Sequence, residues 1–103
     1  MADLRKLSFS LSLAQKAGKL ASGDTAVQFS VKSGKAYLLL LANDASENSK
    51  RYILNLAENN DVEVVSCLNK QDLGAAIGKA QRTAIAVLDK NFSVMIKKQI
   101  YDV

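Results

Sequence analysis

The stretch "AYLLLLANDAS", Ala36 to Ser46, joins the longest apolar run of the chain to a polar turn. Its apolar part, Ala36 to Ala42, is bounded by residues that favour turns. A continuous apolar run of this length is typical of a strand covered on both faces, because both sets of alternating side chains must be buried. We therefore expect residues 36–42 to form the central strand of an α/β sheet.

The polar turn after this strand predicts the start of a helix. Asp44 and Glu47 have the spacing of a capping box, in which side chains bind free N–H groups at a helix start. We expect this helix to run from residue 45 to about residue 59. Its predicted inner face consists of Tyr52, Ile53, Leu56 and Ala57.

A first helix is predicted over residues 3–17, where apolar side chains recur with helical period. Gly18 stands where a glycine commonly ends a helix, and Lys16 lies in the last turn. The apolar stripe consists of Leu4, Leu7, Leu11, Ala14 and Ala17.

A second helix is predicted over residues 24–33, after a short extended segment at residues 19–22. Ser22 or Gly23 can cap its start, and Gly34 can end it. These elements lie directly before the central strand.

Two strand–helix pairs are predicted after residue 60. Residues 62–68 and 83–88 form short apolar runs, and each is followed by a segment of helical character. Asn69 can cap the first of these helices, at residues 70–77, and the second begins near Asp89. The order of elements predicts a three-layer α/β/α sandwich on a small mixed four-stranded sheet.

Length and composition predict one globular domain, residues 1–103. The chain is 49% hydrophobic and has no proline, which favours a packed core over disorder. Its longest apolar run is far shorter than the roughly 20 residues of a membrane span. We expect a cytoplasmic protein with no signal peptide and no membrane partner.

The side-chain inventory argues against an enzyme or a metal site. The chain has one cysteine and no histidine, so zinc and iron–sulfur sites are not expected, and Cys67 is predicted to be a buried inert thiol. "GAAIGKA", Gly74 to Ala80, lacks the glycine spacing and the Ser or Thr of a phosphate-binding loop, so Gly78 is interpreted as a helix end. No catalytic group and no cofactor are expected.

Basic residues are the remaining functional signal. The formal net charge is +4 and the pI is about 9.3, a balance that favours polyanionic partners such as nucleic acid. The basic residues gather around the second and fourth predicted helices: Lys16, Lys19, Lys32, Lys35, Lys70, Lys79 and Arg82.

Three predicted helix starts are expected to meet at one edge of the sheet, because loops that leave the carboxyl ends of parallel strands share that edge. They are Gly23-Asp24-Thr25, Asn43-Asp44 and Asn69-Lys70. Free N–H groups at helix starts suit phosphate, and carboxylates there could accept hydrogen bonds from base amino groups. From this pattern alone, RNA binding and a solvated basic face both stay open.

Several motifs in order resemble the ribosomal kink-turn-binding protein family, and most of all its bacterial YlxQ-type branch. They are "GDTAVQFSVKSGKAYLLLLANDAS" and, further on, "LGAAIGK", within a likeness that spans roughly residues 5–100. The resemblance implies a small α/β/α domain that binds structured RNA without catalysis, with ribosomal RNA and ribosomal proteins among its partners.

The resemblance also implies an altered reading surface. Gly23 matches the family's signature glycine and Asp24 takes the small position. Thr25 stands where the family has Asn or Lys, Ala26 where it has Glu or Gln, and Phe29 where it has Lys. Since the amide or carboxylate reads guanine edges in a kink-turn, these departures imply weakened or altered kink-turn preference.

Other positions match the family's RNA-contacting loops. Asp44 matches the loop that lies beside the bound RNA in the family, Lys70 aligns with a basic residue of the family, and Gly78 to Arg82 matches the loop that clamps an extruded nucleotide there. The candidate RNA-binding residues are Gly23, Asp24, Thr25, Gln28, Asp44, Lys70, Gly78, Lys79 and Arg82. The alternative is a protein-interaction module on the same fold, for which exposed Phe29 and Ile77 at this edge would be the sign.

Overall fold

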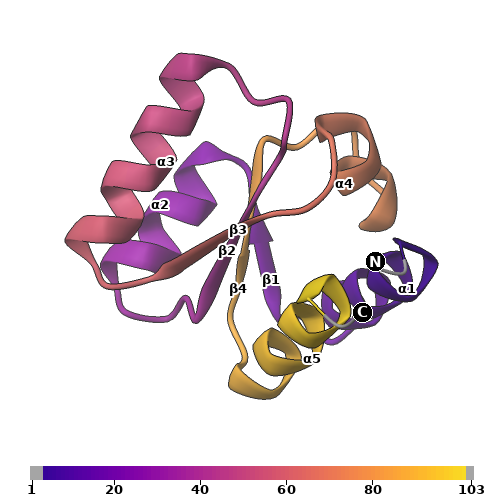
Figure 1. The fold of residues 1–103 in the computed structure, drawn as a ribbon. Helices are drawn as coiled ribbons and strands as arrows, with labels where there is room; N and C mark the ends of the chain where they lie inside the picture. Colours follow the sequence, from indigo (N-terminus) through magenta and orange to yellow (C-terminus); the bar gives the residue numbers. More distant parts are fainter. Residues whose placement is uncertain (1–3, 102–103) are drawn as a thin grey trace.

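Four strands form one mixed sheet between two layers of helices in the computed structural model, which describes residues 4–101 (Figure 1). The elements in chain order are α1 (Leu4–Lys16), β1 (Leu20–Ser22), α2 (Asp24–Lys32), β2 (Leu38–Leu41), α3 (Glu47–Asn59), β3 (Glu63–Ser66), α4 (Lys70–Ala76), β4 (Ala84–Val87) and α5 (Lys90–Tyr101). The predicted α/β/α sandwich on a mixed four-stranded sheet is confirmed.

The strand order in the sheet is β1-β4-β2-β3. β2 pairs parallel with β3, whereas β4 pairs antiparallel with both β1 and β2. Consequently β1, β2 and β3 end at the same edge of the sheet, and β4 begins there. We call this edge the rim; it consists of Gly23, the turn at residues 42–46, the turn at residues 67–69, and the connector, residues 77–83, between α4 and β4.

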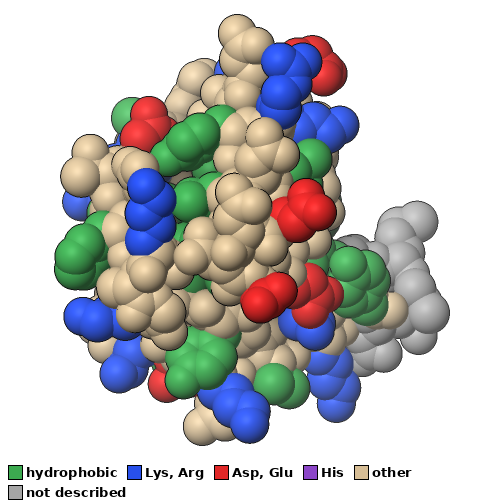
Figure 2. All heavy atoms as spheres, turned by 90° about the vertical axis from the view of Figure 1, so that its left-hand side faces the viewer, with side chains coloured by type: hydrophobic (Ala, Val, Ile, Leu, Met, Phe, Trp, Pro, Cys, Tyr) green, Lys and Arg blue, Asp and Glu red, His purple; other side chains and the backbone are tan. Residues whose placement is uncertain are grey.

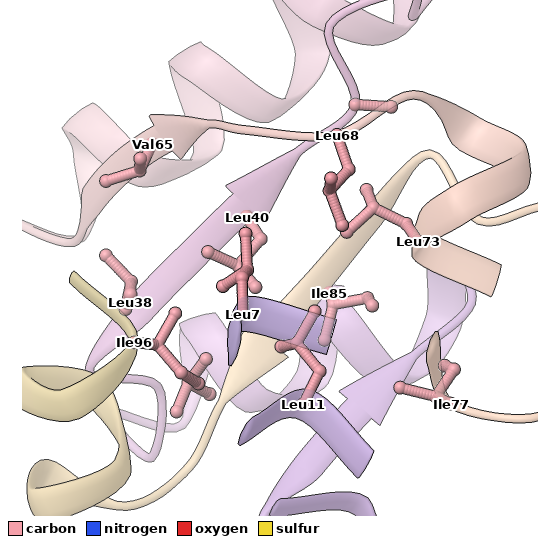
Figure 3. Close-up of a cluster of buried hydrophobic side chains, with 12 residues drawn as sticks. Leu7, Leu11, Leu38, Leu40, Val65, Leu68, Leu73, Ile77, Ile85 and Ile96 are labelled. Carbon is pink, nitrogen blue, oxygen red and sulfur yellow. The ribbon is translucent and has the colours of Figure 1, made fainter. Parts of the chain in front are cut away.

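One half of the core lies between the sheet and α1, α4 and α5 (Figure 3). Leu38 and Leu40 of β2 point into this half, where they meet Leu7 and Leu11 of α1 and Ile96 of α5. All five side chains are fully buried. This packing holds α1, α4 and α5 against one face of the sheet.

The other half lies between the sheet and the pair α2 and α3. Leu39 and Leu41 point to this side and pack with Val27, Val31 and Ile53. Because successive side chains of a strand point to opposite faces, four consecutive leucines serve both halves of the core. The prediction of a strand covered on both faces is confirmed.

The predicted start of α3 is wrong. The helix begins at Glu47, and its cap is Ser46, whose Oγ accepts a hydrogen bond from the Ser49 N–H at 3.2 Å. The Asp44 carboxylate lies too early in the chain to cap this helix and binds another element. The inner face is also narrower than predicted, because Tyr52 is 45% exposed and lies on the flank of the buried stripe.

The ends of α1 also depart from the predicted stripe. Leu4 and Ala17 are exposed, and residue 3, the predicted start, lies outside the described residues. The predicted glycine helix ends are confirmed, since Gly18 and Gly34 have φ of 72° and 77°, a region that glycine enters without steric cost. No helix within residues 4–101 is long and apolar enough to cross a membrane.

Candidate functional site

A hollow of about 480 Å³ opens at the rim between α2, α3 and the connector. We call it the rim hollow. It is lined by the start of α2, the first turns of α3 and the end of the connector: Gly23, Asp24, Val27, Asn48, Ser49, Tyr52, Ile53, Gln81, Arg82, Thr83 and Ala84. Segments far apart in the chain therefore contribute to one concave surface.

The β1–α2 turn presents an uncovered helix start to this hollow. Gly23 is the N-cap residue of α2, with φ 91° and ψ 149°, and no side chain caps the helix there. A positive φ of this size strongly favours glycine, which also leaves the first N–H groups of the helix open to solvent. Asp24, in the first turn, adds a carboxylate beside them.

Arg82 ties the connector to β1. Its Nε donates to the Ser22 Oγ at 3.2 Å, and its Nη1 donates to the carbonyl oxygens of Gln81 at 3.0 Å and Ala80 at 3.3 Å. These bonds use Nε and Nη1 and hold the guanidinium in the wall of the rim hollow. The cation is thus presented in a fixed position instead of on a freely rotating side chain.

Asp44 ties the turn after β2 to the start of α4. Its Oδ1 accepts a hydrogen bond from the Lys70 N–H at 2.8 Å, and the Lys70 carbonyl oxygen accepts one from the Arg82 N–H at 3.1 Å. Asn69 caps α4 as predicted, because its Oδ1 accepts from the Asp72 N–H at 2.7 Å. The turns of the rim are therefore joined by hydrogen bonds.

The nine candidate RNA-binding residues fall into three groups according to where the structure places them: at the rim hollow, on the outer side of α2, and at the α4 end of the connector. Gly23, Asp24 and Arg82 line the rim hollow, and Asp44 and Lys70 are connected to it by the bonds just described.

Two further predicted residues, Thr25 and Gln28, line a separate hollow on the outer side of α2. We call this the α2 hollow; it has a volume of about 450 Å³, and Phe29, Lys32 and Ser33 also line it. Thr25 therefore faces a different hollow from Asp24, the residue before it.

Gly78 and Lys79 lie at the other end of the connector. Both are exposed, Gly78 has φ 72°, and the Lys79 N–H donates to the Gly74 carbonyl oxygen at 2.9 Å. Gly74 is buried, and a Cβ atom there would overlap the Ala80 carbonyl oxygen. The connector backbone thus passes directly over α4.

The first turns of α3 form a wall that the sequence reasoning missed. Asn48, Ser49 and Tyr52 line the rim hollow, although Tyr52 was predicted to face the core. The available signal was the polar pair Asn48-Ser49 with an aromatic one turn later, since residues three and four apart share a helix face. With the start of α3 at Glu47, Asn48 and Ser49 lie in its first turn, next to the rim hollow.

Charge on the face formed by α2 and α3 is unevenly distributed (Figure 2). Lysine and arginine side chains lie at its upper end, its left-hand side and its lower margin, whereas acidic side chains gather to the right of its centre, with others at the upper end and the upper left. Phe29 of α2 points to solvent, with 62% of its surface exposed, and the Lys35 Nζ lies 5.5 Å from the centre of its ring.

Cys67 is partly buried against the half of the core that lies between the sheet and α1, α4 and α5. Burial raises the pKa of its thiol from 9.0 to about 11. Cys67 was predicted to be buried and is only partly so, and its thiol is protonated at neutral pH. Across residues 4–101, no three His, Cys, Asp or Glu side chains form a group that could hold a metal ion.

Comparison with known proteins gives four likenesses. The model of the ribosomal protein L7Ae/L30e/S12e/Gadd45 family matches residues 5–96. The RNA-binding protein YlxQ of Bacillus subtilis is 32% identical over 83 residues, which cover 81% of this chain and 83% of that protein.

The large ribosomal subunit protein eL8 of Picrophilus torridus is 32% identical over 75 residues, 72% of this chain and 59% of that protein. A solved structure from Bacillus halodurans C, described as a protein with unknown function, superimposes with a TM-score of 0.86 at 34% identity. The superposition covers 95% of this chain and 98% of the other.

Proposed function

Because this chain belongs to the ribosomal protein L7Ae/L30e/S12e/Gadd45 family, we propose that it is a non-catalytic RNA-binding protein that uses the rim. The observation that carries the proposal is the rim hollow itself. An open helix start and a fixed arginine face one concave surface there, held by hydrogen bonds between turns. Such a surface suits a folded RNA, which is recognised mainly by shape and backbone contacts.

Each group at the rim has a role in this proposal. The N–H groups at the start of α2 and the Nη2 group of Arg82 donate to phosphate oxygens. The Asp24 carboxylate accepts from a base amino group, and the side chains of Lys70 and Lys79 add phosphate contacts along the connector. Structured RNA, including ribosomal RNA, is the partner class, and contacts to ribosomal proteins would follow from binding on a ribosome.

Kink-turn preference is proposed to be weak or altered. Thr25 and Ala26 are both exposed on α2, but Ala26 has no hydrogen-bonding group on its side chain. Each bidentate base contact is worth about 1–3 kcal/mol of discrimination, so its loss lowers selectivity while phosphate affinity persists.

The alternative of a protein-interaction module depended on exposed apolar residues at the rim. Ile77 is only 6% exposed and packs in the core, and Phe29 lines the α2 hollow instead. Neither Ile77 nor Phe29 is therefore an exposed apolar residue of the rim, which favours RNA over protein.

A salt titration of binding tests the proposal. The RNAs are a kink-turn stem and the same stem with its sheared G·A pairs replaced by Watson–Crick pairs. We expect salt to weaken binding to both, with a log–log slope of about −0.7 to −0.9 for each phosphate neutralised, and a small difference between the two RNAs. No binding to either RNA at low salt would contradict the proposal.

Paired charge variants locate the surface. The variant Lys70→Gln/Lys79→Gln should weaken binding and reduce the salt slope by about 2, because two phosphate contacts are lost. The control Lys90→Gln/Lys98→Gln makes the same change of charge on exposed positions of α5, which lies away from the rim (Figure 1). Equal losses in the two variants would mean that only net charge matters.

A further inference from the structure

We propose that the Phe29 ring stacks on an unpaired base of the bound RNA, an inference that rests on the proposed function and extends the RNA contact from the rim onto α2. Phe29 is the most exposed large hydrophobic residue within residues 4–101, at 62%. The ring is held on a helix, where it forms one wall of the α2 hollow. An aromatic face presented in this way stacks on bases of any sequence.

The surroundings of the ring have the charge and hydrogen-bonding groups that a nucleotide needs. Lys32 lines the same hollow, and Lys35 places its ammonium 5.5 Å from the ring centre. Thr25, Gln28 and Ser33 complete the hollow, whose surface is mostly apolar, as a surface for stacking is, and among residues 4–101 no carboxylate lines it. Stacking with adjacent cations matches a base and its phosphates better than an apolar protein segment.

The two hollows also lie along one path. Asp24 lines the rim hollow, and the next residue, Thr25, lines the α2 hollow. A strand that leaves the rim therefore passes the first turn of α2 and reaches Phe29 without crossing the sheet. Lys35, whose ammonium lies over the ring, is not among the described residues that line the hollow.

The experiment uses a tryptophan at this position as the reporter. The chain has no tryptophan, so the emission of Phe29→Trp reports on this site alone. The RNAs are a stem with an internal single-stranded bulge and the same stem fully paired. We expect Phe29→Trp to keep wild-type affinity for the bulged RNA and its emission to be quenched on binding, with no quenching by the paired stem.

Truncation variants measure the stacking itself. Phe29→Ala and Phe29→Leu should each weaken binding to the bulged RNA by about 5- to 150-fold, because both lack the aromatic face. Phe29→Tyr should restore it. Since the side chain is exposed, all variants should keep the wild-type thermal midpoint in circular dichroism, which is the control for folding.

The possible failures are distinguishable. If wild type binds the bulged RNA and Phe29→Ala binds it equally well, the stacking proposal is wrong and the rim proposal stands. If Phe29→Leu binds like wild type while Phe29→Ala does not, the contact is apolar without stacking, which also overturns the inference. If wild type binds neither RNA, both proposals are overturned.

Discussion

Replacing Gly74 by alanine should displace the connector and destabilise the protein. A Cβ atom at this position would overlap the Ala80 carbonyl oxygen and would lie 2.6 Å from the Ala80 carbonyl carbon and 3.0 Å from the Lys79 carbonyl oxygen. All three atoms belong to the backbone, so no side-chain rotation relieves the overlap. Because carbon contacts are most favourable at about 3.5–4.0 Å, the connector must withdraw by roughly 1 Å.

The size of the effect follows from the bonds that hold the connector in place. Withdrawal strains the Lys79 N–H bond to Gly74 and the Arg82 N–H bond to Lys70, each worth about 1 kcal/mol. Overpacking of a buried site costs about 1–3 kcal/mol, and the better helix propensity of alanine offsets about 1 kcal/mol. We expect a net loss of about 2–4 kcal/mol in the free energy of unfolding.

Urea unfolding followed by circular dichroism measures this loss. The matched control is Gly78→Ala, where a Cβ atom meets nothing within 4 Å and only the positive φ of 72° opposes the change. That control should lose about 1 kcal/mol. If Gly74→Ala were as stable as wild type or more stable, the overlap with the Ala80 backbone would cost no net free energy, and the connector would not be locked onto α4.

Three further changes test residues in the turns of the rim. Asp44→Ala removes the acceptor of the Lys70 N–H and should cost about 1–2 kcal/mol in urea unfolding, whereas Asp44→Asn, which keeps an oxygen, should lose less. Ser46→Ala removes the cap of α3 and should cost about 1 kcal/mol by the same assay; an unchanged midpoint would show that the hydroxyl bond to Ser49 does not stabilise the helix. The raised pKa of Cys67, about 11 against 9.0, means that the folded state holds the thiol proton through a range of pH in which the unfolded state releases it. Stability should therefore fall as pH rises from about 9 to 11, and less so in Cys67→Ala; parallel pH profiles of the two proteins would contradict the effect of burial.

Local sequence patterns determined the layers of the fold and most helix ends. Four successive leucines in β2 could be satisfied only by apolar cover on both faces, and this required helices on each side of the sheet. The Asn69 cap and the glycine ends at Gly18 and Gly34 depend only on neighbours within a turn of helix, so a short window of sequence was enough to predict them. The meeting of the turns at one rim followed from the order of strands and helices.

The composition of the candidate site was decided by the tertiary structure. Asp44 had the spacing of a local cap, but its partner is the Lys70 N–H, 26 residues away, and Ser46 took the cap. The spacing of apolar residues along the chain does not show whether a carboxylate binds a neighbouring N–H group or a distant one.

Packing of each helix against the sheet decided the rest, because it determines which side chains at the edge of the buried stripe border a hollow. Tyr52 was thereby moved from the core to the wall of the rim hollow, and Thr25 and Gln28 were separated from Asp24. The packing of α2 likewise leaves Phe29 exposed to solvent. A sequence pattern marks the buried stripe of a helix, but only packing against the sheet determines where its flanks lie.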